Sequence, residues 1–125
     1  MKVYISGVIS AKQLVDAVTI ADVCVHPSYI ENSSNTICEM QLLGCPVIST
    51  DVGGTSSLIK NRENGILVPA NDPYSIACQI VEIFKNKDKS IKIGKNGRLT
   101  AIKRHDPNCI IGDLMNAIRS ISKIN

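Results

Sequence analysis

Two glutamates, eight positions apart, enclose the stretch of this chain best suited to chemistry, HPSYIENSSNTICEM at residues 26–40. Between Glu31 and Glu39 lies a run of small polar residues, Asn32, Ser33, Ser34, Asn35 and Thr36. An apolar run precedes this stretch and a helical pattern follows it, which places the polar run between a strand end and a helix start. Backbone N–H groups at a helix start lack intrahelical partners, and together with the helix dipole they attract a phosphate. Carboxylates accept hydrogen bonds from sugar hydroxyls, so the stretch predicts a ligand with a phosphate between two sugars, such as a nucleotide sugar.

Both glutamates also have ordinary structural interpretations. The sequence TICE, from Thr36 to Glu39, has the form of a capping box, in which the third helical residue reaches back to the N–H of the cap. Glu31 taken alone is an exposed loop acid. These alternatives stay open on the local sequence.

Short apolar runs that alternate with helical stripes predict the elements that position these residues. Strands are expected at residues 3–5, 23–25, 46–50 and 65–69. Helices are expected at residues 10–21, 36–43, 55–59, 73–84, 90–103 and 109–121. This order predicts an α/β fold, a Rossmann-like parallel sheet flanked by helices. In such a sheet, ligands bind beyond the carboxyl ends of the strands, where residues 26–34 and 51–55 fall.

Length and composition narrow the classes of function. A chain of 125 residues fits one domain. One Phe and no Trp leave few aromatic rings for stacking on bases, so nucleic acid is not expected as a partner. The apolar runs are too short for a membrane span, and the N-terminus is too weakly apolar for a secretory signal, which predicts a cytoplasmic location. The five cysteines form no C-x-x-C pair and are expected to be buried thiols.

The charge is unevenly distributed along the chain. Residues 1–84 carry eight acidic and four basic side chains, whereas residues 85–125 carry three acidic and ten basic ones. A solvated helix surface is the favoured interpretation of the basic half. Attraction to anionic lipid head groups, as a peripheral contact at the inner face of a membrane, is the alternative.

Four blocks in a fixed order carry a family resemblance. They are ADV followed by HPS, the two glutamates with seven residues between them, GCPVISTDVGG at residues 44–54, and NGILVP at residues 64–69. In this order they resemble the C-terminal, donor-binding domain of retaining glycosyltransferases of family 4, over residues 3–121. The resemblance implies one incomplete half of a GT-B fold, which has two Rossmann-like domains. Residues 1–125 would then be a single partial nucleotide-sugar-binding domain, without the N-terminal acceptor domain.

The resemblance also implies roles for individual residues. Glu31, the catalytic candidate, matches the residue that contacts hydroxyls of the transferred sugar, and Glu39 matches the one that holds the ribose. Backbone amides would face the donor, those of Asn32, Ser33 and Ser34 toward the sugar and those of Asn35 and Thr36 toward the distal phosphate. The donor would be a UDP-, GDP- or ADP-sugar, and the acceptor a sugar or a lipid-linked sugar bound on the other domain. No metal or other cofactor is expected, and the chain has no Asp-any-Asp pair.

The function expected from these observations is the donor-binding part of a retaining glycosyltransferase of the hexosyltransferase type. A noncatalytic Rossmann-like module that binds a nucleotide or a protein is the alternative. The chain alone is expected to be inactive, to bind a donor with about 4 to 6 kcal/mol, and to be able to self-associate. His26 is expected to be packed or capping rather than catalytic, and His105 is assigned no chemistry.

Overall fold

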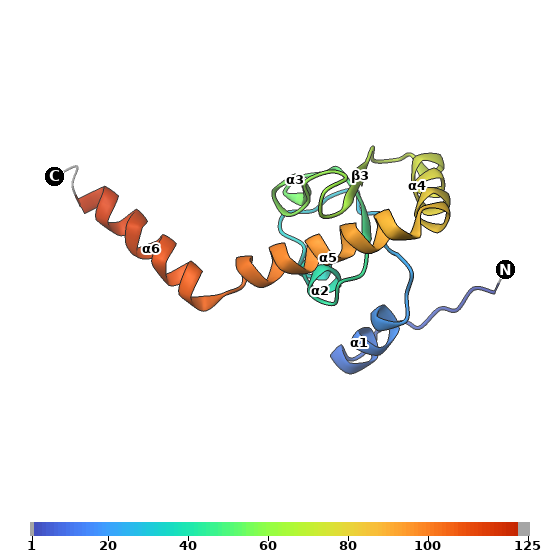
Figure 1. The fold of residues 1–125 in the computed structure, drawn as a ribbon, viewed down its shortest axis with the longest axis horizontal. Helices are drawn as coiled ribbons and strands as arrows, with labels where there is room; N and C mark the ends of the chain where they lie inside the picture. Colours follow the sequence, from blue (N-terminus) through green and yellow to red (C-terminus); the bar gives the residue numbers. More distant parts are fainter. Residues whose placement is uncertain (1, 123–125) are drawn as a thin grey trace.

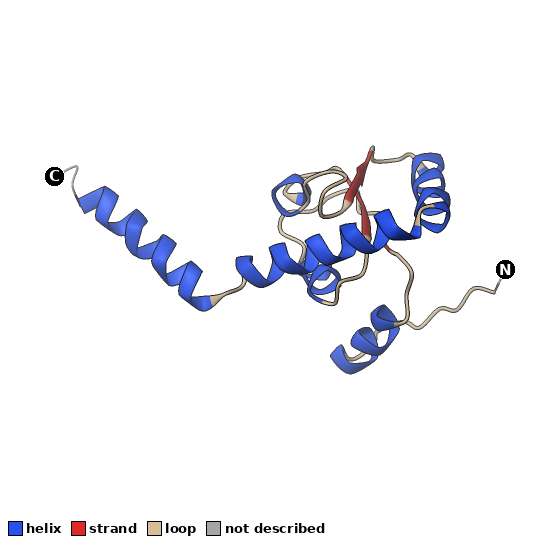
Figure 2. Cartoon of the chain, in the orientation of Figure 1, coloured by secondary structure: helices blue, strands red, loops and turns tan. Residues whose placement is uncertain are grey.

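The computed structural model describes residues 2–122. In this part, the chain folds into three short parallel strands flanked by helices (Figure 1). The elements of this part are α1 (Ala11–Thr19), β1 (Cys24–His26), α2 (Asn35–Leu42), β2 (Val47–Thr50), α3 (Thr55–Leu58), β3 (Ile66–Val68), α4 (Pro73–Lys85), α5 (Lys87–Arg104) and α6 (Pro107–Ser122). The sheet has the order β1-β2-β3, and both of its pairings are parallel. Helices separate the strands along the chain (Figure 2), which confirms the predicted α/β fold with a Rossmann-like parallel sheet.

Local signals place the helix ends. Ser10 caps α1 in a capping box, because its Oγ accepts from the N–H of Gln13 while the Gln13 side chain accepts from the N–H of Ser10. Asp72 caps α4 with Pro73 in the first turn. After α2, Gly44 adopts a φ of 78°, the left-handed conformation that lets the chain leave a helix. Each of these three signals was readable from neighbouring residues.

The strand expected at residues 3–5 is wrong. Val3, Tyr4 and Ile5 lie outside the sheet, and their relative exposures are 73%, 85% and 94%. A strand forms when its backbone groups pair with those of a neighbouring strand. Within the described residues, the strand pairings join only β1 with β2 and β2 with β3, so residues 3–5 have no strand beside them.

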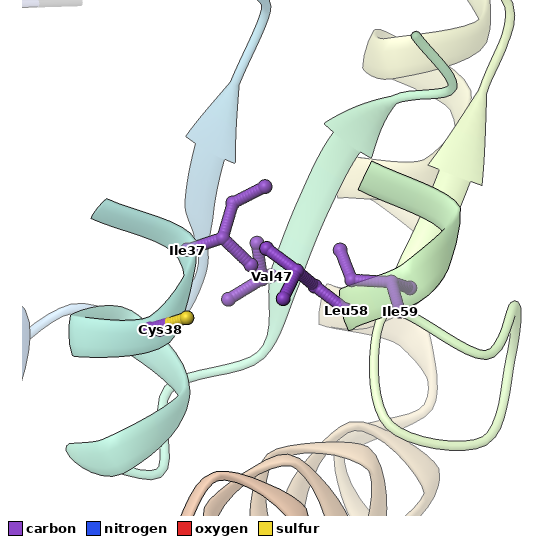
Figure 3. Close-up of a cluster of buried hydrophobic side chains, with 5 residues drawn as sticks. All are labelled: Ile37, Cys38, Val47, Leu58 and Ile59. Carbon is purple, nitrogen blue, oxygen red and sulfur yellow. The ribbon is translucent and has the colours of Figure 1, made fainter. Parts of the chain in front are cut away.

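The core forms on both faces of the sheet because side chains alternate along β2. Val47 faces one side (Figure 3), where it packs with residues of α2, of α3 and of the position just after α3, namely Ile37, Cys38, Leu58 and Ile59. Ile48 faces the other side, where it packs with residues of β3, α4 and α5, Ile66, Val68, Ile83 and Ile93. A strand covered on both faces reads as a continuous apolar run, as the sequence of β2 does.

Helix α5 closes over α2 at close range. The backbone of α5 at Gly94 lies so near the α2–β2 turn that a Cβ there would be 2.3 Å from the carbonyl oxygen of Gly44. At the end of α5, the Arg104 guanidinium donates to the carbonyl of Leu58 at 2.9 Å and to Gln41 Oε1 at 3.2 Å. These contacts fix α2, which carries the predicted site, against the rest of the molecule.

Helix α6 extends away from the sheet at the end of α5 (Figure 1). It was expected at residues 109–121 and begins slightly earlier, after Asp106. None of its residues is buried, and its large apolar side chains are exposed, namely Ile110, Ile111, Leu114, Met115, Ile118 and Ile121. None of the helices described here is both long and apolar enough to cross a bilayer.

The cysteines divide into two groups. Cys24, Cys38 and Cys45 are buried, as predicted, whereas Cys78 and Cys109 are exposed. The expectation is therefore wrong for the last two. Cys78 lies two residues beyond Ile76 in α4, on the side opposite the packed residues Ile76, Ile80 and Ile83, and Cys109 lies on the exposed helix α6.

Candidate functional site

The loops that follow the three strands gather at one edge of the sheet, because parallel strands end at the same side. These loops are residues 27–34 after β1, 51–54 after β2 and 69–72 after β3. Hydrogen bonds tie them together: Thr50 Oγ1 donates to the carbonyl of Ser28 at 2.5 Å, and Tyr29 Oη donates to Asn71 Oδ1 at 3.3 Å. The predicted polar run lies in the first of these loops and leads into α2.

Ser34 caps α2. Its Oγ accepts from the N–H of Ile37 at 3.3 Å, and its side chain is buried. Thr36 is consequently the second residue of the helix and Glu39 the fifth, so the capping box considered for TICE does not form. Glu39 is exposed, and within residues 2–122 its carboxylate has no hydrogen-bond or ion-pair partner. The structural interpretation of Glu39 thereby loses its basis.

The first amides of α2 are directed out of the helix end. Asn35 and Thr36 are its first two residues, so their N–H groups have no carbonyl one turn earlier to donate to. The N–H of Asn32 is engaged locally, since it donates to Glu31 Oε1 at 3.1 Å. An anion at this helix end would therefore meet the amides of Asn35 and Thr36 and the positive end of the helix dipole.

Glu31 lies beside this helix end and is held by both of its oxygens. Oε2 is 2.9 Å from His26 Nε2, and Oε1 accepts from the N–H of Asn32. An ionised carboxylate only accepts, so Nε2 carries the proton in this pair. The hydrogen bond from His26 keeps the pKa of the Glu31 carboxyl below its usual value, and the Asn32 N–H acts in the same direction against partial desolvation. Glu31 is thus an ionised, oriented acceptor.

Two glycines after β2 bring a second loop onto the backbone of Glu31 and Asn32. A Cβ at Gly53 would lie 1.7 Å from the carbonyl oxygen of Glu31, and one at Gly54 would lie 1.7 Å from that of Asn32. The N–H of Gly54 donates to the Glu31 carbonyl at 3.2 Å. Only glycine allows this approach, and Gly53 in addition has a φ of 50°. Two of the blocks that carried the resemblance therefore meet in space.

The structure brings together most of the residues that the sequence singled out. Glu31 and the polar run from Asn32 to Thr36 share one helix start, and Glu39 follows about one turn later. His26 was expected to be packed or capping, and its side chain is only 17% exposed, but sequence reasoning missed that it also binds Glu31. Its position at the last residue of a strand, where parallel sheets carry their sites, was the available signal.

The chain matches the family model of glycosyl transferases group 1 over residues 1–100. It is 35% identical to the capsular polysaccharide biosynthesis glycosyltransferase CapM of Staphylococcus aureus over 77 residues, which are 62% of this chain and 20% of CapM. Sucrose-phosphate synthase from Thermosynechococcus elongatus has a TM-score of 0.80 at 29% identity, with 96% of this chain and 30% of that one covered. Anabaena Alr3699/HepE in complex with UDP has a TM-score of 0.75 at 25% identity, with 83% and 29% covered.

Fold and similarity together define a C-terminal, Rossmann-like domain of a GT-B glycosyltransferase. The chain belongs to the family of glycosyl transferases group 1. It spans less than a third of the length of the curated relatives it matches.

Proposed function

We propose that this chain is the donor-binding part of a retaining glycosyltransferase of family 4, which transfers a hexose from a nucleoside diphosphate sugar to an acceptor. The observation that carries the proposal is the arrangement around the start of α2, where two free amides lie between two carboxylates. In this arrangement Glu31 accepts hydrogen bonds from hydroxyls of the transferred sugar, and Glu39 accepts hydrogen bonds from hydroxyls of the ribose. The amides of Asn35 and Thr36 bind the distal phosphate between them.

The same arrangement supports a mechanism for the bond that breaks. Negative charge develops on the departing diphosphate, and backbone amides that already point at it stabilise that charge without reorganisation. We propose that α2 supplies this stabilisation from the chain itself and that no metal is required. The departing phosphate itself helps to deprotonate the acceptor, which arrives on the same face of the sugar, so no side chain of this chain serves as general base.

The proposal places the acceptor, a sugar or a lipid-linked sugar, on a second domain of a longer protein. Closure of two domains over a donor excludes water and brings the reactants together, an effect worth up to about 7 to 11 kcal/mol. We therefore expect the 125-residue chain by itself to bind a donor weakly and to transfer no sugar. A radiolabelled transfer assay with sugar and lipid-linked acceptors checks this, and reproducible turnover would contradict it.

Titration of the chain with UDP-, GDP- and ADP-glucose, followed by ¹H–¹⁵N NMR, tests donor binding. The amides of Asn35 and Thr36 are expected to shift with one of the three nucleotides. Glu39→Gln is expected to weaken that binding by about 1 to 3 kcal/mol, because a charged acceptor is lost, and to leave the free energy of unfolding unchanged.

Glu63→Gln is the matched control, since Glu63 is an exposed glutamate just before β3, at the amino ends of the strands. Equal affinities in Glu39→Gln and Glu63→Gln would contradict the ribose role. Absence of any nucleotide-dependent shift at α2, with binding of a protein partner instead, would favour the noncatalytic module.

Two further partners stay predictions. The basic side chains of residues 85–125 are expected to form a solvated helix surface. Flotation with anionic vesicles tests the alternative, a peripheral membrane contact. The exposed apolar side chains of α6 are expected to favour self-association at high concentration, which sedimentation velocity measures.

A further inference from the structure

His26 occupies a fixed position at the edge of the site. It is the last residue of β1 and pairs in register with Ser49 of β2. Its carbonyl also lies 3.5 Å from Thr50 Oγ1. Its side chain is only 17% exposed. A side chain on a strand paired into a sheet is held more rigidly than one on a loop, so His26 is suited to orient a neighbour.

The neighbour that His26 contacts is Glu31, the residue proposed to bind the transferred sugar. His26 Nε2 donates to Glu31 Oε2 at 2.9 Å, and the Oγ of Ser34 lies 3.4 Å from the same nitrogen. Glu31 itself stands on the loop between β1 and α2, where no strand or helix fixes its rotamer. With Asn32 bound to Oε1, each carboxylate oxygen accepts one protein hydrogen bond and keeps a further lone pair for a ligand.

We propose that His26 is a positioning residue, which holds the Glu31 carboxylate turned toward the donor sugar. The role extends the proposed function and rests on it. In this proposal, the binding of the donor's sugar depends on His26. The binding of the nucleotide, through Glu39 and the start of α2, does not depend on it.

Two substitutions separate this role from packing. His26→Leu fills the space but removes the N–H donor. His26→Gln keeps an N–H donor at similar reach, although without the ring. His105→Leu is the control, because His105 is an exposed histidine at the end of α5. All variants are compared with the native chain by NMR titration with UDP-glucose and with UDP, and by the ¹³C shift of the Glu31 carboxyl as a function of pH.

His26→Leu is expected to weaken the binding of UDP-glucose about tenfold, which is about 1.4 kcal/mol, and the binding of UDP by less than about twofold, because only the sugar depends on the Glu31 carboxylate. The pKa of Glu31 is expected to rise toward its usual value in this variant, because the hydrogen bond from His26 is the main cause of the lowered pKa and is lost. His26→Gln is expected to recover most of the UDP-glucose affinity. In a Glu31→Gln background, His26→Leu is expected to have no further effect.

Equal weakening of UDP and UDP-glucose by His26→Leu would overturn the proposal, since it would show a general effect on the helix start. An unchanged Glu31 pKa in His26→Leu would overturn it as well. If the native chain binds neither ligand, the proposed function fails, and the Glu31 titration still decides whether His26 controls that carboxylate.

Discussion

The packed centre of the molecule and helix α6 both carry regular apolar patterns, but only the centre buries them. In the centre, Ile37 of α2 and Ile48 of β2 have no exposed surface. In α6, Ile118 and Leu114 are more than half exposed, although they lie four residues apart on one helix face. An apolar stripe thus predicts that a helix forms, and it leaves undecided which surface covers the stripe.

The N-terminal segment resembles α6 in this respect. Residues 3–5 have the composition of a strand, yet they lie in solvent without a neighbour to pair with. A strand is stabilised by hydrogen bonds to another strand, so composition alone does not form one. The candidate site lies at an edge of the sheet, where hydrogen bonds between the loops hold it to the packed centre.

Truncation of one isoleucine in each region is expected to give the largest contrast. Ile37→Ala should lower the free energy of unfolding by about 2 to 5 kcal/mol, because it leaves a cavity between α2, α3 and the sheet. Ile118→Ala should change it by less than about 0.5 kcal/mol, since the side chain is 51% exposed. Urea unfolding of both variants measures the difference. Similar losses would show that α6 is packed in solution.

Paired helix glycines offer an intermediate test of the same comparison. Gly94→Ala should destabilise the chain by about 1 to 3 kcal/mol, because the new methyl group meets the carbonyl of Gly44 and forces α5 away from α2. In Gly112→Ala, in α6, the new methyl group has no atom within 4 Å, so the substitution should stabilise this helix by up to about 1 kcal/mol and raise the helix content. Urea unfolding and circular dichroism measure the two effects. A stabilising Gly94→Ala would contradict the close packing of α5 on α2.

The smallest contrast concerns two acidic residues at helix starts. The Ser75 hydroxyl and N–H bonded to Asp72 keep the pKa of this carboxyl below its usual value. A depressed folded-state pKa stabilises the fold above the unfolded pKa, and this stabilisation is lost as the pH falls through the folded pKa. Asp72→Ala should therefore lower the urea midpoint at pH 7 and have progressively less effect as the pH falls below about 4.

Asp106→Ala is the control for this pair, because Asp106 accepts from the N–H of Asn108 at the start of α6. Since α6 contributes no buried residue, loss of the Asp106 hydrogen bond should leave the urea midpoint at pH 7 unchanged. A midpoint that is equally sensitive to both substitutions would contradict the difference between α4 and α6.

Where sequence reasoning was correct, the signals were local. The helices expected at residues 10–21 and 73–84 form, and their caps, Ser10 and Asp72, each bind a backbone N–H within one helical turn. Where it was open or wrong, two neighbouring candidates competed or a distant residue decided. Of the two interpretations left open for Glu39, the capping box at Thr36 does not form, because Ser34, another small hydroxyl residue of the same run, caps α2. Cys78 and Cys109 follow apolar neighbours, but they fall on exposed helix faces.

The sequence by itself determined the α/β order, the position of the polar run at a helix start and the two carboxylates around it, because these follow from periodicity and capping over a few residues. Only the tertiary structure decided that His26 binds Glu31 and that Gly53 and Gly54 press on the backbone of Glu31 and Asn32. Gly53 and Gly54 follow β2, whereas Glu31 and Asn32 follow β1, so their contact joins the ends of two parallel strands. These ends meet at one edge only after the sheet has formed, so no local spacing encodes the contact. His26 and Glu31 are five residues apart, and their contact depends on how the loop after β1 folds.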